Sequence, residues 1–160
     1  MPPSPELSIL LKGLDEGYHK KAWHGPNLRG SIRGLPARDA AWRPRKGRHN
    51  IWEIVVHCAY WKYIVRRRIL GEKRGSFALK GSNWFKRPDV MSAAAWRNDV
   101  NLLEQMHQSM IDTIAQLSTS DLRKKPRGSK VDNQAIISGI AMHDVYHAGQ
   151  IQILKRLMKR

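Results

Sequence analysis

The segment from Asn133 to the C-terminus constrains the fold of this chain more than any other. Its apolar positions are separated alternately by four and three residues, which is the pattern of a long helix that buries one stripe in a bundle. The buried stripe is predicted to contain Ile136, Ile140, His143, His147, Gln150, Leu154 and Leu157. Two histidines and a glutamine therefore occupy positions where such a fold would otherwise place apolar side chains.

His143 and His147 are four residues apart, so helical geometry places both rings on one face, about 6 Å apart. A buried polar group without a partner costs roughly 1–3 kcal/mol, so this pair needs a compensating interaction. A shared metal ion would provide it, and hydrogen-bonded core histidines are the alternative. Hydrolytic zinc motifs of the form His-Glu-x-x-His place a glutamate after the first histidine. This chain has the shorter Asp144 there; we expect it to face solvent, which disfavours a protease.

The chain contains four helical patterns and no convincing alternating strand pattern, so the sequence predicts an all-α fold. Asn50 provides an N-cap for the second helix, and Gly71 ends it. Residues 121–132 are polar and are predicted to form a loop. The four helical segments are 6–35, with a break near Gly25 and Pro26, then 50–71, 92–117 and 132–160.

The connection from Gly71 to Met91 is too long for a simple helical hairpin. It favours a crossover between parallel neighbouring helices, so we predict a four-helix bundle with one long crossover between the second and third helices. Aromatic side chains in this connection are expected to pin it to the bundle; they are Phe77, Trp84 and Phe85. A chain of 160 residues is typical of one domain, and residues 1–160 are expected to form it.

Two histidines do not complete a metal site, and the sequence leaves the third ligand open. His57 lies well inside the second helix, on a row with Trp61. His107 is the rival on the third helix, although the same row can be drawn through Met106, which would turn His107 outward. The neighbouring Cys58 points about 100° away from His57 and is expected to be a buried structural thiol. The remaining histidines, near the ends of expected helices, are His19, His24 and His49.

The charge of the chain is strongly positive, with 29 Lys and Arg against 13 Asp and Glu and a formal net charge of +16. Such a field attracts nucleic acid, anionic lipid or anionic small molecules. The basic residues are dispersed and no nucleic-acid-reading motif accompanies them, so nucleic-acid binding is disfavoured and expected to be nonspecific if present. No apolar run approaches the ~20 residues of a membrane span. A single cysteine and no signal-peptide pattern lead us to expect a cytoplasmic protein that does not bind membranes.

Several motifs resemble the DinB-like superfamily of metal-binding four-helix bundles, which includes the YfiT-like proteins. They are Ala-Trp-His-Gly-Pro at 22–26, Ala-Trp-Arg-Pro at 41–44, Asn-Ile-Trp-Glu-Ile at 50–54 followed by His57, Tyr60 and Trp61, and His-Asp-Val-Tyr-His-Ala-Gly-Gln-Ile at 143–151. The resemblance implies a left-handed up-down-down-up bundle, often a homodimer, with a divalent metal held by three histidines. Carried over by position, these ligands are His57, His143 and His147, and His107 becomes a core or surface residue.

Three neutral imidazoles leave coordination positions for water or substrate. Nitrogen ligands suit zinc, nickel, iron or copper, and we expect zinc or nickel ahead of iron or copper. The resemblance implies a metal-dependent thiol S-transferase or isomerase, which joins a small thiol such as bacillithiol, mycothiol or glutathione to a small electrophile. The alternatives are a non-catalytic metal-binding bundle in stress response and a basic nucleic-acid-binding protein. Trp61 and Gln150 are candidate pocket residues beside the histidines.

Overall fold

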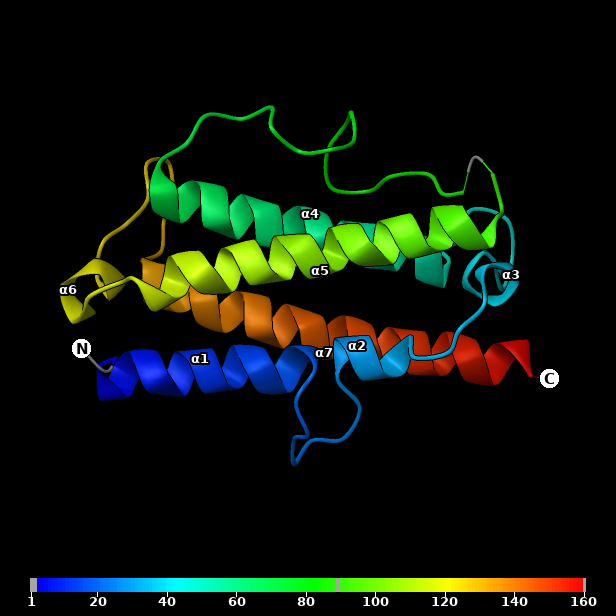
Figure 1. Ribbon diagram of the computed structural model, residues 1–160, viewed down its shortest axis with the longest axis horizontal. Helices are drawn as coiled ribbons and strands as arrows, with labels where there is room; N and C mark the ends of the chain where they lie inside the picture. Colours follow the sequence, from blue (N-terminus) through cyan, green and yellow to red (C-terminus); the bar gives the residue numbers. More distant parts are fainter. Residues whose placement is uncertain (1–2, 89, 160) are drawn as a thin grey trace.

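The computed structural model describes residues 3–88 and 90–159, and every regular element in that part of the chain is a helix (Figure 1). The long helices are α1 (Pro5–Tyr18), α4 (Ile51–Leu70), α5 (Ala93–Ala115) and α7 (Asn133–Met158). Single-turn helices lie in the connections; they are α2 (Leu28–Ser31), α3 (Ala37–Ala40) and α6 (Thr119–Leu122). The all-α class predicted from the sequence is confirmed. None of the helices within the described ranges is long and apolar enough to cross a membrane.

The four long helices lie side by side, with α7 packed against both α1 and α4, and α4 packed against α5 (Figure 1). In Figure 1, α1 and α7 run from left to right, and α4 and α5 run in the opposite direction. Because the consecutive helices α4 and α5 are parallel, the chain needs the long connection 71–92, which passes over α4. Phe85 of this connection is buried, and the ring centroid of Phe77 lies 5.2 Å from that of Tyr60 on α4. These aromatic contacts hold the connection against the bundle, as the sequence predicted.

Side-chain caps determine where the long helices begin. Each cap accepts a hydrogen bond from the backbone N–H three residues later, which satisfies one of the free donors at a helix start. At its other end, α4 stops at Gly71, whose φ of 69° is in the left-handed region that glycine adopts without strain. The predicted limits of the second helix at Asn50 and Gly71 are therefore confirmed. The capping residues are Ser4, Asn50, Ser92 and Asp132.

Two connections differ from the sequence prediction. Helix α1 ends at Tyr18, and helix resumes only for the single turn α2 rather than over 28–35. The Asn27 side chain causes this restart, because it accepts from the Gly30 N–H at 2.7 Å and donates to the Lys20 carbonyl at 2.7 Å. The predicted loop at 121–132 begins inside α6, a single turn that starts with a capping box between Ser118 and Asp121.

The buried stripe of α7 is shifted from the predicted row. Ile136 is half-buried and Leu157 is 42% exposed, so neither is a core residue. Asp144 was expected to face solvent, and this was wrong: it is fully buried and ion-paired with the fully buried Lys62 of α4. A buried counter-ion makes this position tolerable for a carboxylate. The buried residues of α7 are Asn133, Ile137, Ile140, Asp144, His147, Ala148 and Ile151.

Glu53, in the first turn of α4, links this helix by hydrogen bonds to the segment that precedes it and to the long connection that follows it. Arg43 donates to its carboxylate at 2.8 Å, the Arg87 backbone N–H donates at 3.3 Å, and His49 Nδ1 lies 3.1 Å away. Burial alone would raise the pKa of the Glu53 carboxyl, but these hydrogen bonds hold the pKa below its ordinary value. The ionised carboxylate is therefore the form that stabilises the fold.

We expect Glu53→Gln to lower the free energy of unfolding at neutral pH by roughly 1–3 kcal/mol. Because the folded-state pKa lies below the unfolded value of about 4.3, this contribution is present above that pH and is lost as the pH falls through the folded pKa. Urea unfolding at several pH values measures the deficit, which should shrink in acid. Glu16→Gln, which removes a partner from a longer surface pair with Lys12 at 3.8 Å, should have little effect. A deficit that is independent of pH would contradict the assignment.

Candidate metal centre

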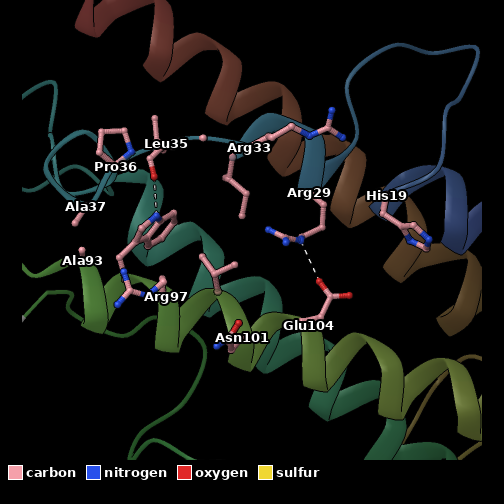
Figure 2. Close-up of a pocket in the computed structure, with 14 residues that line it drawn as sticks. His19, Arg29, Arg33, Leu35, Pro36, Ala37, Ala93, Arg97, Asn101 and Glu104 are labelled. Atoms are coloured by element: carbon pink, nitrogen blue, oxygen red, sulfur yellow. Dashed lines mark hydrogen bonds and ion pairs between the residues drawn. The ribbon is translucent and has the colours of Figure 1, made fainter.

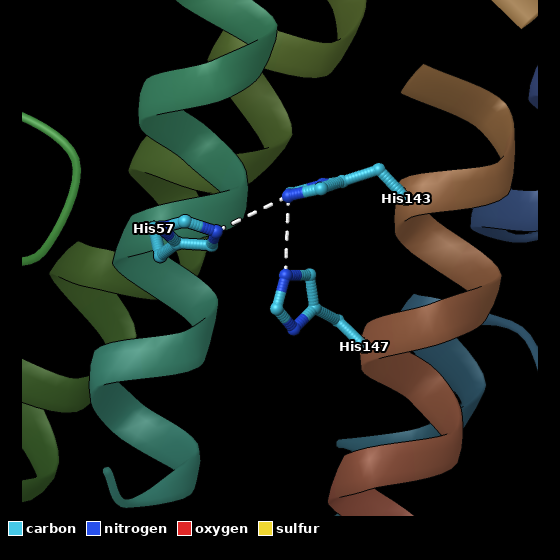
Figure 3. A group of neighbouring side chains, drawn as sticks. All are labelled: His57, His143 and His147. Atoms are coloured by element: carbon cyan, nitrogen blue, oxygen red, sulfur yellow. Dashed lines mark hydrogen bonds between the residues drawn. The ribbon is translucent and has the colours of Figure 1, made fainter. Parts of the chain in front are cut away.

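His57 on α4 faces His143 and His147 on α7 across the interface between the two helices (Figure 3). The Nε2 atom of His143 lies 3.1 Å from Nε2 of His57 and 3.1 Å from Nε2 of His147. His57 and His147 are 5% and 3% exposed, and His143 is half-buried. The structure therefore brings together the three histidines selected from the sequence, with one nitrogen of each directed at a common point. We refer to them as the histidine cluster.

The outer ring nitrogens of two of these histidines fix their tautomers. Nδ1 of His57 lies 2.9 Å from the backbone carbonyl of Asn83, and Nδ1 of His147 lies 2.7 Å from Oε1 of Gln150. Both oxygens can only accept, so both Nδ1 atoms carry the proton and both Nε2 atoms direct a lone pair inward. His143 Nε2 can donate to at most one of these lone pairs. Its own Nδ1 is buried and has no hydrogen-bond partner within the described residues.

A divalent cation fits this donor set better than hydrogen bonds among the rings do. Without a cation, at least one inward lone pair has no donor. Nitrogens at about 2.0–2.1 Å from a tetrahedral zinc ion lie about 3.3 Å from one another, close to the observed 3.1 Å. The ligand atoms of His57, His143 and His147 all lie within 4.8 Å of one another. The pattern in which Nδ1 donates to a protein oxygen while Nε2 points inward is typical of histidines that bind metals.

Burial keeps the three imidazoles neutral. It lowers the pKa of His57 below the ordinary value, that of His143 to about 3 and that of His147 to about 4. Proximity adds to this effect, because a charge on His57 would disfavour a second charge on either histidine of α7. The neutral ring is the form that ligates a metal, so the cluster is ready to bind one at physiological pH.

Two residues of the long connection, Asn83 and Trp84, hold His57 in place. Asn83 has a left-handed backbone with φ of 62°, which asparagine tolerates better than most residues. Its carbonyl accepts from His57, and its side-chain oxygen accepts from the indole N–H of Trp61 at 2.9 Å. Trp84 stacks between His57 and His49, with ring centroids 3.8 and 3.7 Å away. The role of Asn83 was not predicted from the sequence, where the preference of asparagine for left-handed turns was the available signal.

Trp61 and Gln150, the two candidate pocket residues, border the histidine cluster. The ring centroid of Trp61 lies 6.3 Å from that of His57 and 6.4 Å from that of His143. Gln150 accepts from His147, and its amide donates to the hydroxyl of Tyr146 at 3.0 Å. Tyr146 is 63% exposed, so the cluster is near the surface on this side. Gln150 orients a histidine of the cluster, and its role toward a bound ligand stays a prediction.

His107, the rival third ligand, is not part of the histidine cluster. It is 3% exposed, and neither of its ring nitrogens has a hydrogen-bond partner among the described residues. Together with Asp15 and His19 it forms a second group whose ligand atoms lie within 4.8 Å. However, the Lys20 ammonium lies 2.5 Å from the Asp15 carboxylate, and burial together with the Lys62 charge lowers the pKa of His107 to about 2. These ammonium groups oppose a cation here, so this group is the poorer metal site.

Cys58 lies next to the histidine cluster but is a core residue, as the sequence predicted. Its sulfur lies within 4.8 Å of the ligand atoms of His143 and Asp144. Burial, and then the nearby charge of Asp144, raise the pKa of this fully buried thiol well above its ordinary value. Because the thiolate is the nucleophile and the metal ligand, the protonated Cys58 is suited to neither role.

The fold and the histidine cluster define a class of all-helical proteins whose core can hold a metal ion between two helices. A family profile described as the DinB superfamily matches residues 22–151, more than half of the chain and including all three histidines of the cluster. The chain therefore belongs to the DinB superfamily, which confirms the resemblance found in the sequence motifs. No curated protein and no solved structure shows significant similarity to the chain.

Proposed function

We propose that this protein is a divalent-metal-dependent enzyme that joins a low-molecular-weight thiol to a small electrophile, as a thiol S-transferase or isomerase. The observation that carries the proposal is the convergence of three neutral imidazoles, in which His143 Nε2 lies 3.1 Å from the Nε2 atoms of both His57 and His147 and all three ligand atoms lie within 4.8 Å of one another. Three protein ligands are typical of catalytic rather than structural zinc sites, since a position is left for water or substrate. When bound there, a divalent ion would lower the pKa of a coordinated thiol. Nitrogen ligands suit zinc, nickel, iron and copper, and of these we propose zinc or nickel as the bound ion.

The residues of the chain have distinct tasks in this proposal. His57, His143 and His147 hold the ion, and the Nδ1 acceptors Asn83 O and Gln150 Oε1 keep two of these rings oriented. Such supporting groups typically change metal affinity or activity by about 10–100-fold when removed. The Trp61 ring on α4 covers one side of the histidine cluster and limits the access of water to the ion. The side near the exposed Tyr146 is the proposed entrance for thiol and electrophile.

We further infer that residues 1–160 act as one domain with the left-handed up-down-down-up bundle of the superfamily, and that the protein is a cytoplasmic homodimer. Exposed apolar side chains on α1 and α7 support the dimer. Ile9 and Met142 are 72% and 70% exposed and line a groove of about 400 Å³ between the two helices. The dispersed positive charge supports at most nonspecific, salt-dependent binding of nucleic acid.

A conjugation assay tests the enzyme proposal. We expect the metal-loaded protein to accelerate the reaction of glutathione, bacillithiol or mycothiol with chlorodinitrobenzene, followed by absorbance. His143→Ala and removal of the metal should each reduce this rate by roughly 100-fold or more, because loss of a ligand exceeds loss of a supporting group. His24→Ala, an exposed histidine outside the cluster, is the matched control and should retain the rate. If the protein binds metal but no thiol changes its melting temperature or is conjugated above background, a non-catalytic metal-binding role replaces the enzyme.

A further inference from the structure

A cavity of about 760 Å³ lies between α5 and the segment from α2 to the start of α3 (Figure 2). None of the three histidines of the metal cluster lines it, because that cluster lies between α4 and α7. The volume is within the range of about 300–1,000 Å³ that small-molecule sites occupy. The molecule therefore carries a concave site with no side chain in common with the metal centre.

The walls of this cavity carry more positive than negative charge. Arg29, Arg33 and Arg97 line it, against a single carboxylate from Glu104. Figure 2 shows Arg29 and Glu104 joined within the cavity, with Arg29 Nε 3.0 Å from the Glu104 carboxylate. The guanidinium groups of Arg33 and Arg97 make neither a hydrogen bond nor an ion pair with any other described residue. Uncompensated guanidinium groups on a concave surface attract and orient anions.

The wall between these charges is apolar and well packed. Ile32 and Trp96 are 3% and 6% exposed, so each is packed into the wall and only a small part of its apolar surface faces the cavity. The indole N–H of Trp96 is already donated to the Leu35 carbonyl at 2.8 Å, so this side chain offers the cavity an apolar ring rather than a donor. The side-chain amide of Asn101 makes no hydrogen bond within residues 3–88 and 90–159 and is available to a ligand.

One of the charged walls is held in position before any ligand arrives. Glu104 accepts from the hydroxyl of the fully buried Tyr18 at 3.0 Å and from Arg29 at 3.0 Å. Arg29 is thus fixed by a chain of hydrogen bonds that begins in the core. A pre-organised charged group costs less conformational entropy when it binds a ligand.

We propose that this cavity binds a small organic anion, in which a carboxylate or a phosphate monoester is attached to a flat apolar body. The anionic group pairs with the guanidinium groups, which match the geometry of carboxylate and phosphate oxygens. The apolar body lies against Trp96 and the neighbouring Val100 of α5. This site is independent of the proposed thiol chemistry, since it shares no residue with the histidine cluster.

Calorimetric titration of the metal-loaded chain of 160 residues with naphthyl phosphate tests the proposal. We expect one molecule to bind per chain, and Arg33→Gln/Arg97→Gln to weaken the Kd by about tenfold or more, which corresponds to roughly 1.4 kcal/mol. The matched control Arg45→Gln/Arg156→Gln removes the same charge from exposed positions outside the cavity and should change the Kd by less than about twofold, a minor effect on this scale. His143→Ala should bind naphthyl phosphate with the same Kd as the wild type, even where this variant no longer binds the metal.

Two further probes, each of which lacks one part of naphthyl phosphate, complete the experiment. Naphthol lacks the anionic group and inorganic phosphate lacks the apolar body, so each should bind about tenfold more weakly than naphthyl phosphate or worse. Equal weakening in both double variants would overturn the proposal, because the net charge rather than the cavity would then attract the anion. Naphthol binding as tightly as naphthyl phosphate, or no binding heat with millimolar naphthyl phosphate, would also overturn it.

Discussion

Replacing Lys62 by methionine is expected to lower the free energy of unfolding by about 3–5 kcal/mol, because the Asp144 carboxylate would then be buried without its counter-ion. Both side chains are 0% exposed, and the Lys62 ammonium donates directly to Asp144 Oδ2. The same ammonium lies 4.9 Å from the ring centre of Tyr18, which adds a cation–π contact. The pair links α4 to α7 directly behind the histidine cluster, so its loss also loosens the support of His143.

Chemical denaturation of a small set of variants checks this prediction. Lys12→Met, which removes an exposed lysine from a 3.8 Å pair, should change stability by no more than about 0.5 kcal/mol. The double variant Lys62→Met/Asp144→Leu removes both buried charges and should recover most of the loss, since apolar pairs of similar volume often replace buried ion pairs at little cost. A loss of under about 1 kcal/mol for Lys62→Met alone would show that this pair behaves like a surface pair.

Helix α7 illustrates what sequence periodicity predicts and what it misses. The spacing of three and four residues correctly placed His143 and His147 on one face. However, α7 packs against both α1 and α4, so two adjacent stripes of the helix are covered. The second stripe contains Asp144, which was expected to face solvent because it is charged. Its buried partner, Lys62, lies 82 positions earlier in the chain. A local pattern does not contain that partner.

The residues of the candidate site also differ in how far the sequence alone predicts them. The pair on α7 follows from helical spacing, whereas His57 required the family resemblance, because spacing left His107 as an alternative. Asn83 lies in a connection without periodicity, and its bond to His57 depends on the path of the chain over α4. The arginines of the proposed anion-binding cavity come from α2, from the loop after it and from α5, so no single segment of sequence reveals that they share a wall.

Zinc is expected to stabilise the wild-type protein by about 4 kcal/mol when the free ion is at a thousand times its Kd, because the ion binds the folded state and the three ligands are not assembled in the unfolded chain. Replacing any one histidine of the cluster by alanine should abolish both this stabilisation by zinc and the stoichiometric binding of metal. The three variants are His57→Ala, His143→Ala and His147→Ala. Two imidazoles remain in each variant, and they do not complete a site of the usual three protein ligands. Metal analysis and thermal unfolding with and without zinc measure both effects, and nickel provides a second ion for the same comparison.

The metal-free proteins separate ligation from packing in this experiment. Without zinc, His143→Ala should lower the free energy of unfolding by only about 0.5–1.5 kcal/mol, because the ring loses the one hydrogen bond that its Nε2 can donate to His57 or His147, whereas its Nδ1 has no hydrogen-bond partner among the described residues. The difference in stability between the two proteins should therefore be small without zinc and should grow by the full zinc response when zinc is added. The exposed His24 provides the control, because His24→Ala removes an imidazole outside the cluster and should keep the full zinc response. Full metal occupancy in His57→Ala combined with its loss in His107→Ala would move the third ligand from α4 to α5 and overturn the assignment.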